Sequence, residues 1–251
     1  MKTLDVLFTP ADFAALKRRN LDDTTCVVLD VFRATSSIVT ALAHGAQAVI
    51  PVIEISEALV IRRQDPAVVL AGERDGVRIR AEFTGGVDFD LGNSPREFTR
   101  ERVAGKTIVM TTTNGTRALR ACAHAQHVLV ASFLNLNATA EWMARDQPDD
   151  VLIVCSGTFE QAALEDVLAA GALCESLAGA FAGAEISDSA ALAHRLYQVA
   201  KVNLTEAASG SRNGRRLLAI PDLQADVAFC LQRDVFELVV SLQPDGKVTS
   251  A

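Results

Sequence analysis

Residues 111–117 read T-T-T-N-G-T-R and directly follow the three apolar residues at 108–110. The apolar run predicts the end of a buried strand, and the change to threonines and Asn-Gly predicts a turn that starts a helix. The first N–H groups of a helix lack backbone partners, and an arginine fork pairs well with phosphate or carboxylate oxygens. We therefore expect an anion-binding turn here. The alternative is an ordinary capped helix with a surface arginine.

Acidic and hydroxyl side chains follow other predicted strands in the same way. They are Asp30 with Arg33, Glu73 with Arg74, and the triplet Ser156, Gly157 and Thr158; the pair Glu165 and Asp166 stands at the expected start of a long apolar helix. Loops at the carboxyl ends of parallel strands converge, so these side chains should line one site. Carboxylates, hydroxyls and arginines together suit a divalent cation and an anionic substrate.

Each of these groups also has an ordinary structural explanation. Asp30 could cap the helix expected from Arg33, and Glu73 could pair with Arg74 in a surface turn. Negative charge at 165–166 suits any helix N-terminus. The R-N-G-R-R run at 212–216 could bring positive charge to an anion, but a solvated turn is the simpler interpretation.

Apolar periodicity predicts strands that alternate with helices. Strands are expected at 4–9, 25–31, 46–52, 67–71, 107–110, 127–133, 150–155 and 235–242. Helices are expected at 10–19, 33–44, 55–64, 93–103, 116–124, 136–145, 165–180, 188–202 and 222–234, and a hairpin or lid-like excursion at 75–91. This alternation predicts an α/β fold with a largely parallel sheet covered on both faces. No linker divides the chain, so we expect one domain over 1–251, or two closely packed subdomains.

Composition limits the class of partner. The 251 residues carry a net charge of −7 and no basic run of five or more, which argues against nucleic acid. An acidic protein that binds an anion must concentrate its arginines locally or use a divalent metal. Five cysteines without a C-x-x-C pair fit reduced, buried thiols in the cytoplasm, and the sequence gives no sign of a signal peptide or membrane span.

Several common catalytic motifs are absent from the sequence. It contains no G-x-S-x-G serine and no G-x-x-x-x-G-K-[ST] phosphate loop. The string Asp30-Val31-Phe32-Arg33 is only superficially like the nucleophilic loop of haloacid-dehalogenase phosphatases, because phenylalanine stands where that family needs a second aspartate.

Five blocks of the chain resemble the 2-phosphosulfolactate phosphatase family. They are L-D-V-F-R-A-T-S-S-I-V-T-A-L (29–42), G-E-R (72–74), F-D-L-G-N-S-P (89–95), T-T-T-N-G-T-R-A (111–118), and C-S-G-T with L-E-D-V-L-A-A-G-A (155–158 and 164–172). They follow one another in the family's order over most of the chain, from about 25 to 234. Two segments depart from the family's pattern, an inserted-looking stretch at 78–87 and the approach to L-E-D at 159–163.

The resemblance implies a three-layer α/β/α fold with a largely parallel or mixed sheet. It also implies a Mg²⁺-dependent hydrolase that converts (R)-2-phospho-3-sulfolactate to 3-sulfolactate and phosphate, a step associated with coenzyme M biosynthesis. Residues inside the matching blocks become expected site residues: Asp30, Arg33 and Glu73 as catalytic; Arg74, Asn93, Ser94, Thr112, Thr113, Asn114, Gly115, Thr116 and Arg117 as substrate-binding; and Asp30, Glu73, Glu165 and Asp166 as metal ligands.

Two questions stay open at the level of sequence. Asp30 could activate water or attack phosphorus itself. The same turns could also serve a non-catalytic sensor of an anionic phosphorylated or sulfonated metabolite. A homo-oligomer is compatible with the sequence.

Overall fold

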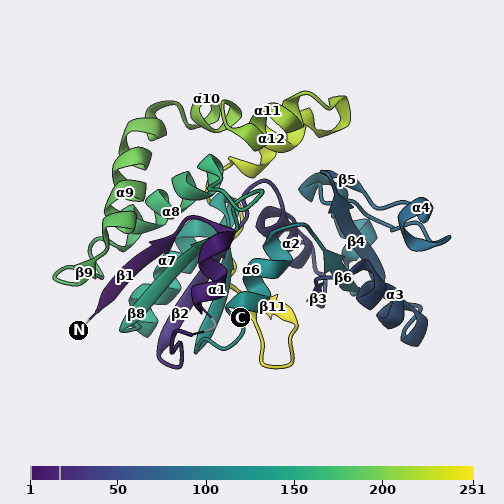
Figure 1. Cartoon of the computed structure of the whole chain (residues 1–251), viewed down its shortest axis with the longest axis horizontal. Coiled ribbons are helices and arrows are strands. Elements are labelled where there is room, and N and C mark those ends of the chain that lie inside the picture. The colour runs from purple at the N-terminus through teal and green to yellow at the C-terminus, as the bar shows by residue number, and fades with distance from the viewer. Residues whose placement is uncertain (1, 17) are drawn as a thin grey trace.

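A mixed sheet of eleven strands forms the centre of the molecule in the computed structural model, which describes residues 2–16 and 18–251 (Figure 1). The strands are β1 (Thr3–Leu7), β2 (Thr24–Leu29), β3 (Ala48–Val52), β4 (Val69–Arg74), β5 (Val77–Arg78), β6 (Thr107–Thr111), β7 (His127–Ala131), β8 (Asp150–Cys155), β9 (Glu185–Ile186), β10 (Val240–Leu242) and β11 (Val248–Ser250). Their order across the sheet is β5-β4-β6-β3-β11-β10-β7-β2-β8-β1-β9.

Helices fill the connections between the strands. The α-helices are α1 (Phe13–Leu16), α2 (Ala34–Ala43), α3 (Ile55–Gln64), α4 (Ala81–Thr84), α5 (Arg100–Val103), α6 (Gly115–Ala121), α7 (Leu136–Asp146), α8 (Leu164–Leu177), α9 (Asp188–Ala200), α10 (Leu204–Ser209), α11 (Arg212–Leu218) and α12 (Gln224–Cys230). Short 3₁₀ turns are η1 (Pro10–Asp12), η2 (Pro95–Glu97), η3 (Phe133–Asn135), η4 (Lys201–Asn203) and η5 (Pro221–Leu223). None of the described helices is long and apolar enough to span a membrane.

Two groups of parallel strands make up most of the sheet. One group contains β4, β6 and β3, and the other contains β7, β2, β8, β1 and β9. The antiparallel hairpin β10–β11 lies between them and pairs with each group through one residue pair, Ser241 with Leu129 and Val248 with Val49. The sheet is therefore largely parallel but mixed, as expected.

Strand β2 shows how helices cover both faces of the sheet. All six of its residues are buried, and successive side chains point to opposite faces. Val27 and Leu29 join a core cluster with residues of α7, α8 and α9, whereas Cys26 and Val28 join a cluster with residues of α2 and α6. This arrangement confirms the expected three-layer α/β/α fold.

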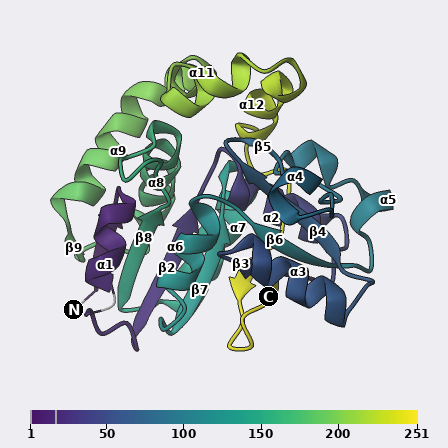
Figure 2. The ribbon, with the colours of Figure 1, turned by 45° about the vertical axis from the view of Figure 1, so that its right-hand side comes forward.

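The final helices form an arch beyond one end of the strands, seen at the top of Figures 1 and 2. Helix α9 packs against α8, where Gly171 leaves no room for a side chain because an added Cβ would lie 2.1 Å from the carbonyl oxygen of Ala193. Helices α10, α11 and α12 complete the arch. This arch brings residues from the end of the chain over the carboxyl ends of β2 and β8.

Several expected boundaries are wrong. The single helix expected at 93–103 is two short turns, η2 and α5, and the strand expected at 235–242 begins only at Val240. The run at 212–216, interpreted as a solvated turn, is the helix α11, whose start is capped by the hydroxyl of Ser211 accepting from the Gly214 N–H. Lys17, inside the helix expected at 10–19, lies outside the described residues.

Candidate active site

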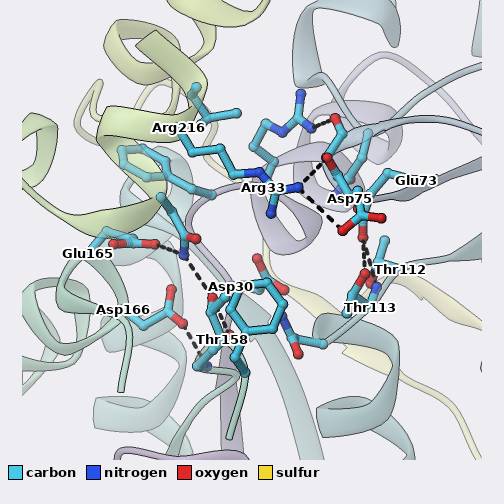
Figure 3. Close-up of a pocket in the computed structure, with 18 residues that line it drawn as sticks. Asp30, Arg33, Glu73, Asp75, Thr112, Thr113, Thr158, Glu165, Asp166 and Arg216 are labelled. Atoms are coloured by element: carbon cyan, nitrogen blue, oxygen red, sulfur yellow. Dashed lines mark hydrogen bonds and ion pairs between the residues drawn. The ribbon is translucent and has the colours of Figure 1, made fainter. Parts of the chain in front are cut away.

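A cavity of about 70 Å³ lies where loops after β2, β4, β6 and β8 meet the start of α8 and the helix α11. Figure 3 shows Asp30 near its centre, with Glu165 and Asp166 on one side and Glu73 and Thr113 on the other. The strand ends therefore converge on one cavity, as the sequence predicts. We call this cavity the acidic pocket.

Asp30 follows β2 and lines the acidic pocket, and no hydrogen bond to its Oδ2 is found among the described residues. Its Oδ1 accepts from the Ala34 N–H at 3.2 Å, and its own N–H donates to the Thr35 hydroxyl at 3.0 Å, which fixes the loop before α2. Burial raises the pKa of Asp30 to about 7, with the neighbouring charges of Glu73 and Glu165 adding to the rise. The surroundings of Asp30 therefore disfavour the charged form of its carboxyl group.

Glu165 and Asp166 enter the pocket from the first turn of α8. Asp166 accepts from the N–H of Val31 at 2.8 Å and of Gly157 at 3.1 Å, and so ties the loops after β2 and β8 together. Glu165 Oε1 accepts from Asn213 at 2.5 Å, whereas its buried Oε2 has no hydrogen-bond partner among the described residues. Burial is the largest cause of a raised pKa at both carboxyls.

Glu73, like Asp166, accepts hydrogen bonds through both carboxylate oxygens. Its Oε1 accepts from both the N–H and the hydroxyl of Thr113 at 2.8 Å, and its Oε2 accepts from the Gly76 N–H at 2.7 Å. Glu73 therefore holds the loop after β6 and the β4–β5 turn in place.

Arg33 places a cation on the wall of the acidic pocket. Its side chain is 3% exposed and donates to Asp226 Oδ2 at 2.8 Å and to the Gly76 carbonyl at 2.5 Å. Asp226, on α12, is fully buried and also accepts from the Ser94 hydroxyl at 2.6 Å. Helix α12 thus fixes the orientation of the Arg33 side chain.

The residues of the turn at 111–117 have different positions relative to the pocket. Thr112, Thr113 and Asn114 line the acidic pocket. Thr116 is buried and bonds back to Thr112, with the Thr116 N–H donating to the Thr112 hydroxyl at 3.2 Å. Gly115 lies against Asp30, because an added Cβ would be 2.7 Å from Asp30 Oδ2 and 2.5 Å from Ala34 Cβ.

The contact at Gly115 predicts a local effect on turnover. In Gly115→Ala the new methyl group must displace Asp30 or α2, and misplacing a reacting group by about 1 Å can cost about 10²-fold in rate. We expect kcat to fall about 30- to 100-fold while the far-ultraviolet circular dichroism spectrum stays that of the wild type. Gly179→Ala is the matched control, because nothing lies within 4 Å of an added Cβ there. Equal kcat values for Gly115→Ala and the wild type would show that Gly115 does not position Asp30.

The numbers of acidic and basic side chains in the acidic pocket indicate whether a divalent cation would fit there. Five acids line it, Asp30, Glu73, Asp75, Glu165 and Asp166, against two arginines, Arg33 and Arg216. The unpartnered Glu165 Oε2 and the excess of carboxylates fit a cation with oxygen ligands. Within residues 2–16 and 18–251, no three His, Cys, Asp or Glu side chains are close enough to form a complete cage. Mg²⁺ usually takes one or two carboxylates together with water and substrate oxygens, so it does not require such a cage.

Five residues expected to bind substrate do not line the acidic pocket. Two of them, Gly115 and Thr116, belong to the turn described above, and the others are Arg74, Ser94 and Arg117. Arg74 turns back to the Ile53 carbonyl and the Thr111 hydroxyl, and Ser94 is bonded to Asp226. Arg117 points to the surface, where it pairs with Glu160 at 3.1 Å. These residues therefore do not form the wall of this cavity, and their contact with substrate stays a prediction.

Other pocket residues carried little or no signal in the sequence. Asn213 donates to Glu165 and to the Thr158 hydroxyl, and Arg216 lines the same wall (Figure 3). The R-N-G-R-R run was the only hint of them. Asp226 was missed entirely, since nothing in the pattern of a helix distinguishes a buried acid from an exposed one.

Fold and pocket together define an α/β protein with a cavity of carboxylates, hydroxyls and arginines at the carboxyl ends of its strands. The particular family follows from comparison of sequences. A family described as 2-phosphosulpholactate phosphatase matches residues 12–245. The chain belongs to this family of phosphoric monoester hydrolases.

Curated relatives agree with this assignment. A probable 2-phosphosulfolactate phosphatase of Thermotoga petrophila is 40% identical over 218 residues, covering 87% of this chain and 88% of the relative. One from Caldicellulosiruptor saccharolyticus is 38% identical over 223 residues, with 87% and 89% covered. One from Pseudothermotoga lettingae is 38% identical over 249 residues and covers 99% of each chain. The similarity therefore spans both parallel groups of the sheet and the acidic pocket between them.

Proposed function

We propose that this protein hydrolyses (R)-2-phospho-3-sulfolactate to 3-sulfolactate and phosphate in a Mg²⁺-dependent reaction. Family membership and the printed activity of the relatives support the substrate. The observation that carries the chemistry is that acids from three separate segments meet two arginines in one cavity. A step of this kind belongs to coenzyme M biosynthesis, and the five buried free cysteines suit a reducing compartment such as the cytoplasm.

Glu165 and Asp30 are the carboxylates that would hold Mg²⁺. Glu165 contributes the unpartnered Oε2, and Asp30 is bonded through only one oxygen. Asp166 and Glu73, whose oxygens already accept N–H groups, would add negative charge and keep the loops in register. When bound, the ion would neutralise charge that accumulates on the transferring phosphoryl group.

The chain's own cations and hydroxyls would receive the phosphoryl group. Arg33 is held rigidly by Asp226 and can therefore bind an oxygen without losing much side-chain entropy. Arg216 adds a second cation from the arch, and Thr112 adds a hydroxyl. These contacts stabilise the reaction when they strengthen as charge develops in the transition state.

Asp30 is the acid that we propose to act on the reacting centre. It would either take a proton from the attacking water or attack phosphorus directly and release phosphate in a second step. Acid quenching of a single turnover separates these routes. Attack by Asp30 expels sulfolactate before phosphate and leaves the phosphoryl group covalently on the protein, whereas direct attack by water releases both products together and leaves no phosphorylated protein.

Phosphate release tests both the function and the cation. Purified protein should release phosphate from (R)-2-phospho-3-sulfolactate with Mg²⁺, and a chelator should lower the rate more than about 100-fold. Adding excess Mg²⁺ should restore the rate, with an unchanged circular dichroism spectrum throughout. 2-Phospholactate, which lacks the sulfonate, is the control substrate and should turn over more slowly. No release from either ester would refute the proposed activity, and release that resists chelation would refute the role of the cation.

A further inference from the structure

A second and larger hollow lies beside the acidic pocket. It has a volume of about 440 Å³ and lies between the segment around β5 and the turns η2 and η5. Four arginines line it, Arg33, Arg78, Arg80 and Arg96, against two acids, Glu97 and Asp222. We call it the arginine cleft. Such a concentration of positive charge is unusual in a protein whose net charge is −7.

A wall of three shared residues separates the arginine cleft from the acidic pocket. Arg33, Gly76 and Asn93 line both. The Arg33 guanidinium is held across this wall by its bonds to Asp226 and to the Gly76 carbonyl. The two hollows are therefore adjacent but have separate linings beyond these residues.

Several polar groups of the cleft are free to bind an anion. Arg80 is exposed, and no hydrogen bond or ion pair of its side chain is found among the described residues. Arg96 makes only long contacts, 3.4 Å to the Asp222 carbonyl and 3.5 Å to Asp226. Asn93, on the wall shared with the acidic pocket, is 5% exposed, and its buried Oδ1 has no partner in the described part of the chain. A buried polar atom without a partner is costly, which points to a ligand or solvent at this position.

We propose that the arginine cleft is a second anion-binding site, separate from the acidic pocket, that takes inorganic phosphate. Arginine forks bind phosphate oxygens in pairs, and two of them, Arg80 and Arg96, are open to a ligand here. Hydrogen phosphate also carries an O–H group that can donate to Asn93 Oδ1, whereas sulfate has no donor at neutral pH. The cleft should therefore prefer phosphate to sulfate.

This site goes beyond the proposed hydrolysis, although the two fit together. Phosphate bound in the cleft leaves the acidic pocket able to accept the next phosphoester. Phosphate bound in the cleft should therefore not compete with the phosphoester for the acidic pocket. Because the contacts are ionic and partly exposed, binding should weaken as salt is added.

Calorimetric titration of the full chain with inorganic phosphate tests the proposal without turnover. The test variant is Arg80→Gln/Arg96→Gln, and the matched control is Arg63→Gln/Arg100→Gln, which removes two exposed arginines outside the cleft. We expect a phosphate site in the wild type and the control that is weakened about tenfold or more in the test variant. Sulfate should bind this site at least about fivefold more weakly than phosphate. The kcat/KM of the test variant should stay within twofold of the wild type.

Three results would overturn the proposal. The first is equal phosphate affinity in the wild type and the test variant. The second is a raised KM for the phosphoester in the test variant, which would make the cleft part of the substrate site. The third is equal affinity for sulfate and phosphate. Binding is measured directly, so failure of the proposed hydrolysis in a separate assay would leave these results interpretable.

Discussion

Asp30→Asn is expected to lower kcat about 10³-fold, because asparagine cannot act as a base, a nucleophile or an anionic metal ligand. The amide keeps the shape of the side chain and can still accept from the Ala34 N–H. The loop before α2 should therefore stay in place. Phosphate release under saturating substrate and Mg²⁺ measures the effect.

The same substitution should not destabilise the fold. The pKa of Asp30 rises from 3.8 to about 7 on folding, so the charged form is disfavoured in the folded state. Without divalent cation, the wild type should lose stability relative to Asp30→Asn as pH rises from about 4 to 7. Melting temperatures in chelator should show the variant equal to or above the wild type at pH 8.

The control for this experiment is Asp149→Asn, at an exposed position outside the acidic pocket. It should turn over like the wild type. A folded Asp30→Asn variant with wild-type kcat would remove Asp30 from the mechanism. A variant that melts far below the wild type would show instead that the carboxylate is needed for folding.

Asp226→Ala is expected to cost about 3–5 kcal/mol of the free energy of unfolding. The change leaves the Arg33 guanidinium, which is 3% exposed, buried without its counter-ion, and the Ser94 hydroxyl without its acceptor. It also removes the contact that holds α12 and the arch to the segment after β2. Urea unfolding followed by circular dichroism measures the loss.

Two further variants, Asp226→Asn and Glu175→Ala, give losses of stability with which that of Asp226→Ala can be compared. Asparagine keeps the shape of the acid and its oxygen acceptor, so it should lose less stability than alanine. Glu175 pairs with Lys201 on the surface, where both side chains are more than a third exposed, and its loss should cost at most about 1 kcal/mol. If Asp226→Ala were no more costly than Glu175→Ala, the buried pair would not be what fixes the arch.

The convergence of the site could be predicted because it follows from the direction of the strands. Asp30 and Thr112 come directly after a strand, Glu73 lies at the end of one, and Thr158 is three residues beyond the end of β8. The carboxyl ends of these strands surround the acidic pocket. Glu165 and Asp166 were found because acids at the start of an apolar helix are conspicuous in sequence. Strand and helix types followed from apolar periods of two and 3.6 residues.

Side-chain direction and the arch could not be predicted in this way. Arg117 stands three residues after Asn114, and one turn of helix carries it from the pocket wall to the surface. Arg74 donates to the Ile53 carbonyl and does not line the acidic pocket. This contact joins segments that are far apart in the sequence. The roles of Asn213 and Asp226 depend on how α11 and α12 fold back over the sheet. Local pattern carries no information about that packing.

Direct calorimetric titration with Mg²⁺ tests the central claim, that acids from separate loops act together in one pocket. The wild type should bind one ion in the folded, substrate-free protein, and Asp30→Asn and Glu165→Gln should each weaken binding about tenfold or more. Asp149→Asn should bind as the wild type does. An ion bound with equal affinity by the wild type, Asp30→Asn and Glu165→Gln would place the cation elsewhere and contradict the account.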